Sequence, residues 1–177
     1  METLSIAASI ERVKAVLRRR PDIGLKDDAS ATTRWQGGTR VVASHANGTR
    51  IETDMPVELG GTGDQVTPGW LMRAGLASCV VTRVAMAAAT EGIELDLLEI
   101  VASSRSNACG LFDLPDATGA PVGAGPLGIE LMVRIAAAGV APERLRALVE
   151  DSNRTAPVSN AICNATPLAL TVDVVGH

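Results

Sequence analysis

The first candidate for chemistry in this sequence is Cys79, in the segment GLASCVV at residues 75–81. A thiol reacts as its thiolate, and that form needs help from a cation, a hydrogen bond or a helix N-terminus. A cysteine that only fills space in a core needs none of these. The small and apolar neighbours of Cys79 therefore leave two interpretations open, a nucleophile or a packing residue between closely spaced elements.

Activation of Cys79 requires a nearby cation, and the sequence offers three arginines. Arg83 follows four residues later and shares a helix face with Cys79. Arg40 and Arg34 come from a predicted strand region and reach Cys79 only through the tertiary fold. The helix dipole acts mainly in the first turn, and Cys79 lies well beyond the predicted helix start at Pro68. A reactive Cys79 therefore depends on one of these arginines.

The other cysteines and the histidines are weaker candidates. Cys109 lies in a long Gly/Pro-rich connection, where an exposed thiol can move, and Cys163 is expected in the core. His45 adjoins a predicted hairpin turn and His177 is the last residue, so neither is expected to be a buried base. The wide cysteine spacing predicts neither a disulfide framework nor a zinc site. We expect no metal and no cofactor.

The composition excludes several classes of protein. The chain has 177 residues, enough for one domain with a real core. Aromatic residues make up only 2% and the net charge is −4, which disfavours nucleic acid as a partner. Charges interrupt the apolar residues near the N-terminus, so we expect neither a signal peptide nor a membrane span. Reduced thiols in the cytoplasm fit best.

Residues 1–29 are predicted to form an amphipathic helix and a linker, ahead of a main domain at residues 30–177. An apolar stripe with helical spacing defines the helix: Ile6, Ile10, Val13 and Leu17. The run Arg18–Arg20 precedes Pro21, and we interpret it as cations at a helix C-terminus rather than as an anion-binding patch.

The main domain begins with short β-rich runs and continues with a long helix. The runs TTRWQ, TRVVASH and TRIETDM, with Asn47-Gly48 between the last two, predict an antiparallel meander. Thr67 and Pro68 are typical of a helix start, and Gly92 is typical of a helix end. The many small residues between them predict a central helix that packs closely against its neighbours.

The second half predicts two strands, two helices and a last strand. The strands are IELDLLEIVASS and LGIELMVRIAAA, and a helix follows Pro142. Thr155 is expected to cap a short helix, and PLALTVDVV is expected to end the chain as a strand. The order predicts an α+β domain, with an antiparallel sheet around a long central helix.

Three segments resemble the OsmC/Ohr family: DMPVELGGTGDQVTPGWLMRAGLASCVV, PERLRALVEDSNRTAPVSNAI and the terminal PLALTVDVV. The resemblance covers about residues 33–175. It implies an intertwined homodimer with shared sheets and with active sites at the subunit interface. It also implies reduction of organic hydroperoxides, in which Cys79 is the peroxidatic thiol and is oxidised to a sulfenic acid. A second cysteine then forms a disulfide that a dithiol reductant opens.

The sequence departs from this family pattern at two positions. Ala156 stands in place of the second cysteine, and Gly69 stands in place of the glutamate that follows the helix-opening proline. Arg40, two residues after a Gly-Gly pair, stands at or one position beyond the place of the family's arginine, and Cys109 is a candidate replacement for the resolving thiol. We expect a peroxidase with one peroxidatic cysteine and an external thiol reductant. The alternatives are a noncatalytic dimer that binds a small apolar or acyl ligand, and a dimer that binds a protein partner.

Overall fold

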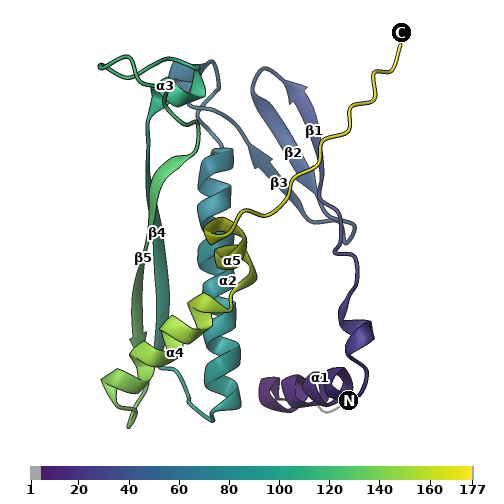
Figure 1. Ribbon diagram of the computed structural model, residues 1–177, viewed down its shortest axis with the longest axis vertical. Coiled ribbons are helices and arrows are strands. Elements are labelled where there is room, and N and C mark those ends of the chain that lie inside the picture. The colour runs from purple at the N-terminus through teal and green to yellow at the C-terminus, as the bar shows by residue number, and fades with distance from the viewer. Residues whose placement is uncertain (1–4, 177) are drawn as a thin grey trace.

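The computed structural model describes residues 5–176 and has two antiparallel sheets on opposite sides of a long helix (Figure 1). The chain begins with helix α1, Ile6–Arg19, which Ser5 caps by accepting a hydrogen bond from the Ala8 amide. A short 3₁₀ helix, η1, Pro21–Gly24, leads toward the first strand. Helix α1 has no fully buried residue and packs on the long helix.

The first sheet confirms the predicted antiparallel meander. It comprises β1, Thr32–Gly37, β2, Arg40–Ser44, and β3, Arg50–Thr53, in that spatial order. Gly48 has φ +94° in the turn between β2 and β3, a conformation that glycine adopts without a steric cost. A second 3₁₀ helix, η2, Val57–Leu59, then leads into a glycine loop.

Helix α2, Pro68–Thr90, is the centre of the fold, as the sequence predicts. The Thr67 hydroxyl accepts a hydrogen bond from the Trp70 amide at 3.2 Å, and Gly92, with φ +68°, follows the helix end. Its buried residues recur every four positions and so form one stripe: Leu76, Val80, Val84 and Ala88. Only this face of α2 is fully buried in the single chain.

The second sheet and two further helices pack on α2. Strands β4, Leu97–Ser106, and β5, Pro126–Ala136, form a long antiparallel ladder, and the short helix α3, Ala108–Leu111, lies in the connection between them. Helices α4, Pro142–Arg154, and α5, Pro157–Cys163, complete the core around the buried stripe of α2. Leu148 of α4 and Ala156 belong to this core.

In the part of the chain that the structure describes, α2 is the one helix long and apolar enough to cross a membrane. A core helix of a soluble fold has the same length and composition. The buried stripe of α2 packs against β4, β5, α4 and α5, which is the role of a core helix.

For the last third of the chain, one expectation is wrong and a second is not met within the single chain. Thr155 does not cap α5: it ends α4, and its hydroxyl donates to the Asp151 carbonyl oxygen at 3.0 Å. The expected terminal strand, residues 167–175, has no secondary structure, and its apolar side chains are exposed. A strand requires a neighbouring strand for its backbone hydrogen bonds, and within this single chain the segment has none.

Candidate active site

Cys79 lies in the middle of α2, half-buried. Its side chain packs against the core cluster next to the buried stripe, one position before Val80, which has no exposed surface. An apolar wall on one side and partial exposure on the other suit either packing or reaction with a small molecule. The Cys79 thiol is therefore accessible to a small molecule, although it is not fully exposed on the surface.

The resolving position of the family pattern lies in the same core cluster. Ala156 is the N-cap residue of α5 and is completely buried, and Cys79 packs against the cluster that contains it. Ser159, one turn later, is also buried and donates a hydrogen bond to the Asn153 side chain at 2.8 Å. Cys79 and Ala156, the residue expected at the place of the family's second cysteine, thus both adjoin one core cluster.

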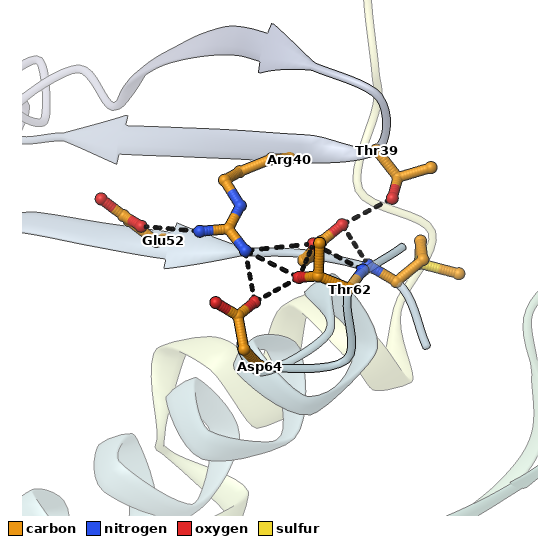
Figure 2. Close-up of polar contacts among 7 residues, drawn as sticks. Thr39, Arg40, Glu52, Thr62 and Asp64 are labelled. Carbon is orange, nitrogen blue, oxygen red and sulfur yellow. Dashed lines mark hydrogen bonds and ion pairs between the residues drawn. The ribbon is translucent and has the colours of Figure 1, made fainter. Parts of the chain in front are cut away.

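Arg40 lies at the start of β2 in a network of carboxylates and hydroxyls, drawn in Figure 2. Its Nη2 donates to Thr62 Oγ1 at 2.8 Å and contacts Asp54 Oδ2 at 3.4 Å, and it also pairs with Asp64. Its Nη1 lies 3.7 Å from a carboxylate oxygen of Glu52 on β3. Arg40 therefore joins the first sheet to the glycine loop that precedes α2.

Asp54 is the buried centre of this network, with 2% of its surface exposed. It accepts hydrogen bonds from the Thr39 hydroxyl and from both the amide and the hydroxyl of Thr62, at 3.1 and 2.7 Å. The Met55 amide donates to it at 2.8 Å. These donors, with Thr39 first, hold the pKa of Asp54 far below its ordinary range, so the carboxylate stays ionised.

Electrostatics keep the network charged at neutral pH. The hydrogen bond from Arg40 is the main cause that lowers the pKa of Asp64 to about 2, with Thr62 contributing further. The same contact raises the pKa of the Arg40 guanidinium, opposed in part by desolvation. Asp54, Thr62 and Asp64 were not predicted as site residues, although an aspartate two residues before Pro56 and an acidic residue in the glycine loop are visible in the sequence.

The candidate cations of Cys79 therefore lie in different places. Within residues 5–176, the ion pairs of Arg40 are with Glu52, Asp54 and Asp64, and Arg40 makes no hydrogen bond to Cys79. Arg34 is exposed on β1, and Arg83 lines a cavity one turn beyond Cys79 on α2.

The two other thiols occupy different environments. Cys109 is half-buried in α3, and its amide donates to the Asn107 side chain at 3.0 Å. The expectation of a buried Cys163 is wrong: this thiol is exposed at the end of α5. The reason is that α5 contacts the core through its first turn, around Ala156 and Ser159, and its last residues extend beyond the core.

His45 makes no contact with Cys79 as a base. His45 is exposed in the β2–β3 turn, where its Nδ1 accepts a hydrogen bond from the Asn47 amide at 3.1 Å. His177 lies outside the described residues. Within residues 5–176, no group of three His, Cys, Asp or Glu side chains is arranged to hold a metal ion.

An open apolar groove of about 780 Å³ lies between α2, β5 and α5. Met72 and Leu76 of α2 face Ile129 and Leu131 of β5 across it, and Cys163 lies at its α5 side. Pockets of this size and character accommodate small apolar ligands. Cys79 does not line the groove, but Leu76, Ile129 and Leu131 belong both to the groove wall and to the core region against which Cys79 packs.

Comparison with known proteins identifies the fold. Residues 61–171 match the family model described as OsmC-like protein. An OsmC-like protein from Mycoplasma pneumoniae has a similar structure, with a TM-score of 0.65 at 15% sequence identity over 80% of this chain and 91% of that chain. No curated protein sequence matches this chain significantly.

Two further solved structures share the fold. One is an organic hydroperoxide resistance protein from Legionella pneumophila, 24% identical, with a TM-score of 0.53 over 77% of this chain and 91% of that chain. The other is an organic hydroperoxide resistance protein from Elizabethkingia anophelis, 21% identical, with a TM-score of 0.56 over 80% of this chain and 93% of that chain. Similarity at these identities establishes the α+β fold, with its antiparallel sheets and long helix.

Proposed function

This chain belongs to the OsmC-like protein family, and we propose that it is a thiol peroxidase that reduces organic hydroperoxides with Cys79 as its peroxidatic residue. The observation that carries the proposal is the position of Cys79, half-buried in the middle of α2 against the core cluster that contains Ala156. The names of the similar proteins from Legionella pneumophila and Elizabethkingia anophelis support hydroperoxides as the substrate class.

The proposed reaction needs only one thiol of the chain. The Cys79 thiolate attacks one oxygen of the peroxide, the O–O bond breaks, and the second oxygen leaves as an alcohol after taking up a proton. Cys79 is then a sulfenic acid, which condenses with an external thiol to a mixed disulfide and releases water. A second external thiol displaces Cys79 and restores it. Because Ala156 replaces the second cysteine, the external thiol is the proposed resolving agent, with Cys109 of α3 as the alternative.

We propose Arg40 as the cation that assists Cys79, in a homodimer. Arg40 is half-buried and always charged, and it matches the place of the family's arginine. The carboxylates that pair with Arg40 compete with the Cys79 thiolate for the N–H donors of the guanidinium. To stabilise the thiolate, Arg40 must therefore share these donors or exchange one carboxylate for Cys79. In a homodimer, a second subunit adds another copy of the first sheet and of α2. Arg40 of one subunit can then assist Cys79 of the other.

The exposed tail supports the homodimer. Apolar residues alternate along it, and their side chains are between 71% and 95% exposed: Leu168, Leu170, Val172 and Val174. Alternation of this kind is typical of a strand with one buried face. A second copy of the chain, with its own exposed sheet edges, is the proposed partner of this strand.

Three free thiols are consistent with a reducing cytoplasm as the location.

Reaction of the reduced protein with cumene hydroperoxide tests the proposal. We expect intact mass spectrometry to show one added oxygen atom, trapped by dimedone on Cys79, and turnover to appear when a dithiol is supplied. Cys79→Ser should abolish both signals, whereas Cys163→Ser should retain them. Cys109→Ser separates the two resolving schemes, because loss of turnover in this variant would assign the resolving role to Cys109. A Cys79 thiol that gains no oxygen from excess hydroperoxide would overturn the peroxidase proposal.

The apolar groove favours a second candidate function, a noncatalytic dimer that binds a small apolar or acyl ligand. The groove between α2, β5 and α5 has about 780 Å³ and mostly apolar walls. Native mass spectrometry of the purified protein tests this candidate, since a bound ligand adds a defined mass. A ligand together with an unreactive Cys79 would favour the binder, whereas an oxidisable Cys79 without ligand would favour the peroxidase.

A further inference from the structure

A second cavity, of about 370 Å³, lies between α1, α2 and α4, at the end of α2 opposite its N-terminus. Helix α1 lies beside this end of α2 in Figure 1 and contacts it. Its lining residues include Ile10, Lys14, Arg83, Met86, Leu148 and Ser152. Cys79 does not line the cavity, and the proposed peroxidase chemistry relies on Arg40 rather than on Arg83.

Arg83 is the unusual residue of this cavity. In residues 5–176, three arginines are partly buried: Arg40, Arg73 and Arg83. Arg40 pairs with carboxylates, and Arg73 donates to the Ser104 hydroxyl at 3.1 Å. Arg83 alone of these three has no hydrogen bond or ion pair within the described residues. A partly desolvated guanidinium stabilises an anion strongly because it offers charge and several donors together.

The other charges of the wall are already paired. Lys14 contacts Glu11 at 2.7 Å, and Arg154 contacts Asp151 at 2.8 Å. Glu91 pairs with Arg144 of α4. The two acidic side chains in the wall, Glu91 and Asp151, thus have cationic partners other than Arg83, and within residues 5–176 Arg83 has no carboxylate partner.

The rest of the wall is suited to a ligand with an apolar part. Ile10 of α1, Met86 of α2 and Leu148 of α4 supply apolar surface. Ser152 of α4, with 2% exposure, has a buried hydroxyl with no hydrogen-bond partner in the described chain. A buried polar group without a partner is uncommon in folded proteins. The volume lies within the range of small-ligand pockets, about 300–1,000 Å³.

We propose that this cavity binds a small carboxylate with a short aliphatic chain. The carboxylate pairs with Arg83, and the chain lies against Ile10, Met86 and Leu148. Because α1 supplies one wall and has no fully buried residue of its own, the ligand also fastens α1 to α2. Ligand binding and docking of the N-terminal helix are therefore coupled.

Titration calorimetry with hexanoate tests the proposal, with 1-hexanol and inorganic phosphate as matched probes. Hexanol has the chain without the charge, and phosphate has charge without the chain. We expect hexanoate to bind at least about tenfold more tightly than either probe, because hexanol lacks the charged hydrogen bond to Arg83 and phosphate lacks the apolar chain that is buried against the wall. Hydrogen exchange of the α1 amides should slow on addition of hexanoate. The Cys79→Ser variant should bind hexanoate like the wild type.

Arg83→Gln removes the charge and keeps a side chain of similar length, and Arg18→Gln is the matched control because Arg18 is an exposed arginine of α1. Arg83→Gln should weaken hexanoate binding by about tenfold or more, and Arg18→Gln should leave it unchanged. Circular dichroism establishes that both variants are folded. Absence of hexanoate binding to the wild type, equal binding of hexanol or phosphate, or unchanged binding by folded Arg83→Gln would overturn the proposal.

Discussion

Arg40 Nη2 lies 3.4 Å from Asp54 Oδ2, across the junction between the first sheet and the glycine loop. Asp54 is 2% exposed, whereas the Arg40 side chain is 30% exposed, so the pair joins a buried anion to a cation that still reaches solvent. Four residues donate hydrogen bonds to the Asp54 carboxylate: Thr39, Arg40, Met55 and Thr62. Arg40 and Asp54 both form hydrogen bonds with Thr62, which hold the glycine loop before α2 against the first sheet.

The network predicts a loss of stability in acid. The pKa of Asp64 is about 2 in the folded protein, against an ordinary value of 3.8. A lowered folded pKa stabilises the protein above the unfolded pKa, and this contribution is lost as the pH falls from about 4 toward 2. Asp54, with a pKa shifted further down, extends the loss to lower pH. The melting temperature should therefore fall steeply over this range.

Asp64→Asn checks this assignment by thermal melts at a series of pH values. The variant should melt lower than the wild type at neutral pH, and its melting temperature should depend less on pH between about 4 and 2. Asp173→Asn, in the exposed tail, is the matched control and should follow the wild type. Parallel curves for wild type and Asp64→Asn would contradict the proposed linkage.

Restoring a thiol at position 156 should convert the chain to an internally resolved peroxidase. Ala156 lies in the core cluster against which Cys79 packs, and a sulfur in place of a hydrogen costs about 1 kcal/mol of overpacking or more. After one equivalent of hydroperoxide, Ala156→Cys should lose alkylation at Cys79 and at the introduced thiol together, which reports a disulfide. Ala161→Cys, on the exposed side of α5, should keep its introduced thiol alkylatable. Equal alkylation in the two variants would argue against proximity of the two positions.

A carboxylate at position 69 should accelerate oxidation of Cys79. A Cβ at Gly69 would have its nearest neighbours at 3.8 and 3.9 Å, Arg73 Nη1 and Thr67 Oγ1, so a side chain fits. Gly69→Glu places an acid in the first turn of α2 at the family's glutamate position, and we expect the rate with cumene hydroperoxide to rise by about tenfold or more. Gly69→Gln, of equal size and no charge, is the control. Stopped-flow rates that are equal for Glu and Gln would show that this position does not serve Cys79.

Gly61 should be intolerant of any side chain. A Cβ there would lie 1.7 Å from the Met55 carbonyl oxygen, which is backbone and cannot move independently of the loop. Gly61→Ala should lower the free energy of unfolding by about 1–3 kcal/mol or more, measured by urea denaturation. Gly128→Ala is the control because a Cβ at this strand position meets nothing within 4 Å, and it should change stability by less than about 0.5 kcal/mol. Similar losses for both variants would contradict the close approach at Gly61.

The tail should determine the oligomeric state. Leu168 and Leu170 lie on one side of an extended segment and are 95% and 85% exposed. Replacing both by aspartate places charges on the face that we expect to be buried in a dimer, so light scattering should report a monomer. Thr171→Asp changes the opposite side and should leave the dimer intact. A wild-type protein that is monomeric at micromolar concentration would contradict the proposed dimer.

The sequence alone determined most of the secondary structure, because the signals are local. Thr67, Pro68 and Gly92 mark the ends of α2 through caps and backbone conformations that depend on adjacent residues. Gly48 marks the β2–β3 turn for the same reason. The order of elements then predicted the α+β class, and the motif around Cys79 predicted the family to which the chain belongs.

Only the tertiary structure decided which side chains meet. Arg40 and Asp64 are 24 residues apart in the chain, and packing of the glycine loop against the first sheet brings them together. Cys163 is exposed because α5 runs past the core, and residues 167–175 lack strand structure because a strand depends on a neighbour rather than on its own sequence. Burial and long-range pairing depend on how distant segments pack together, so the local spacing of residues in the sequence does not predict them.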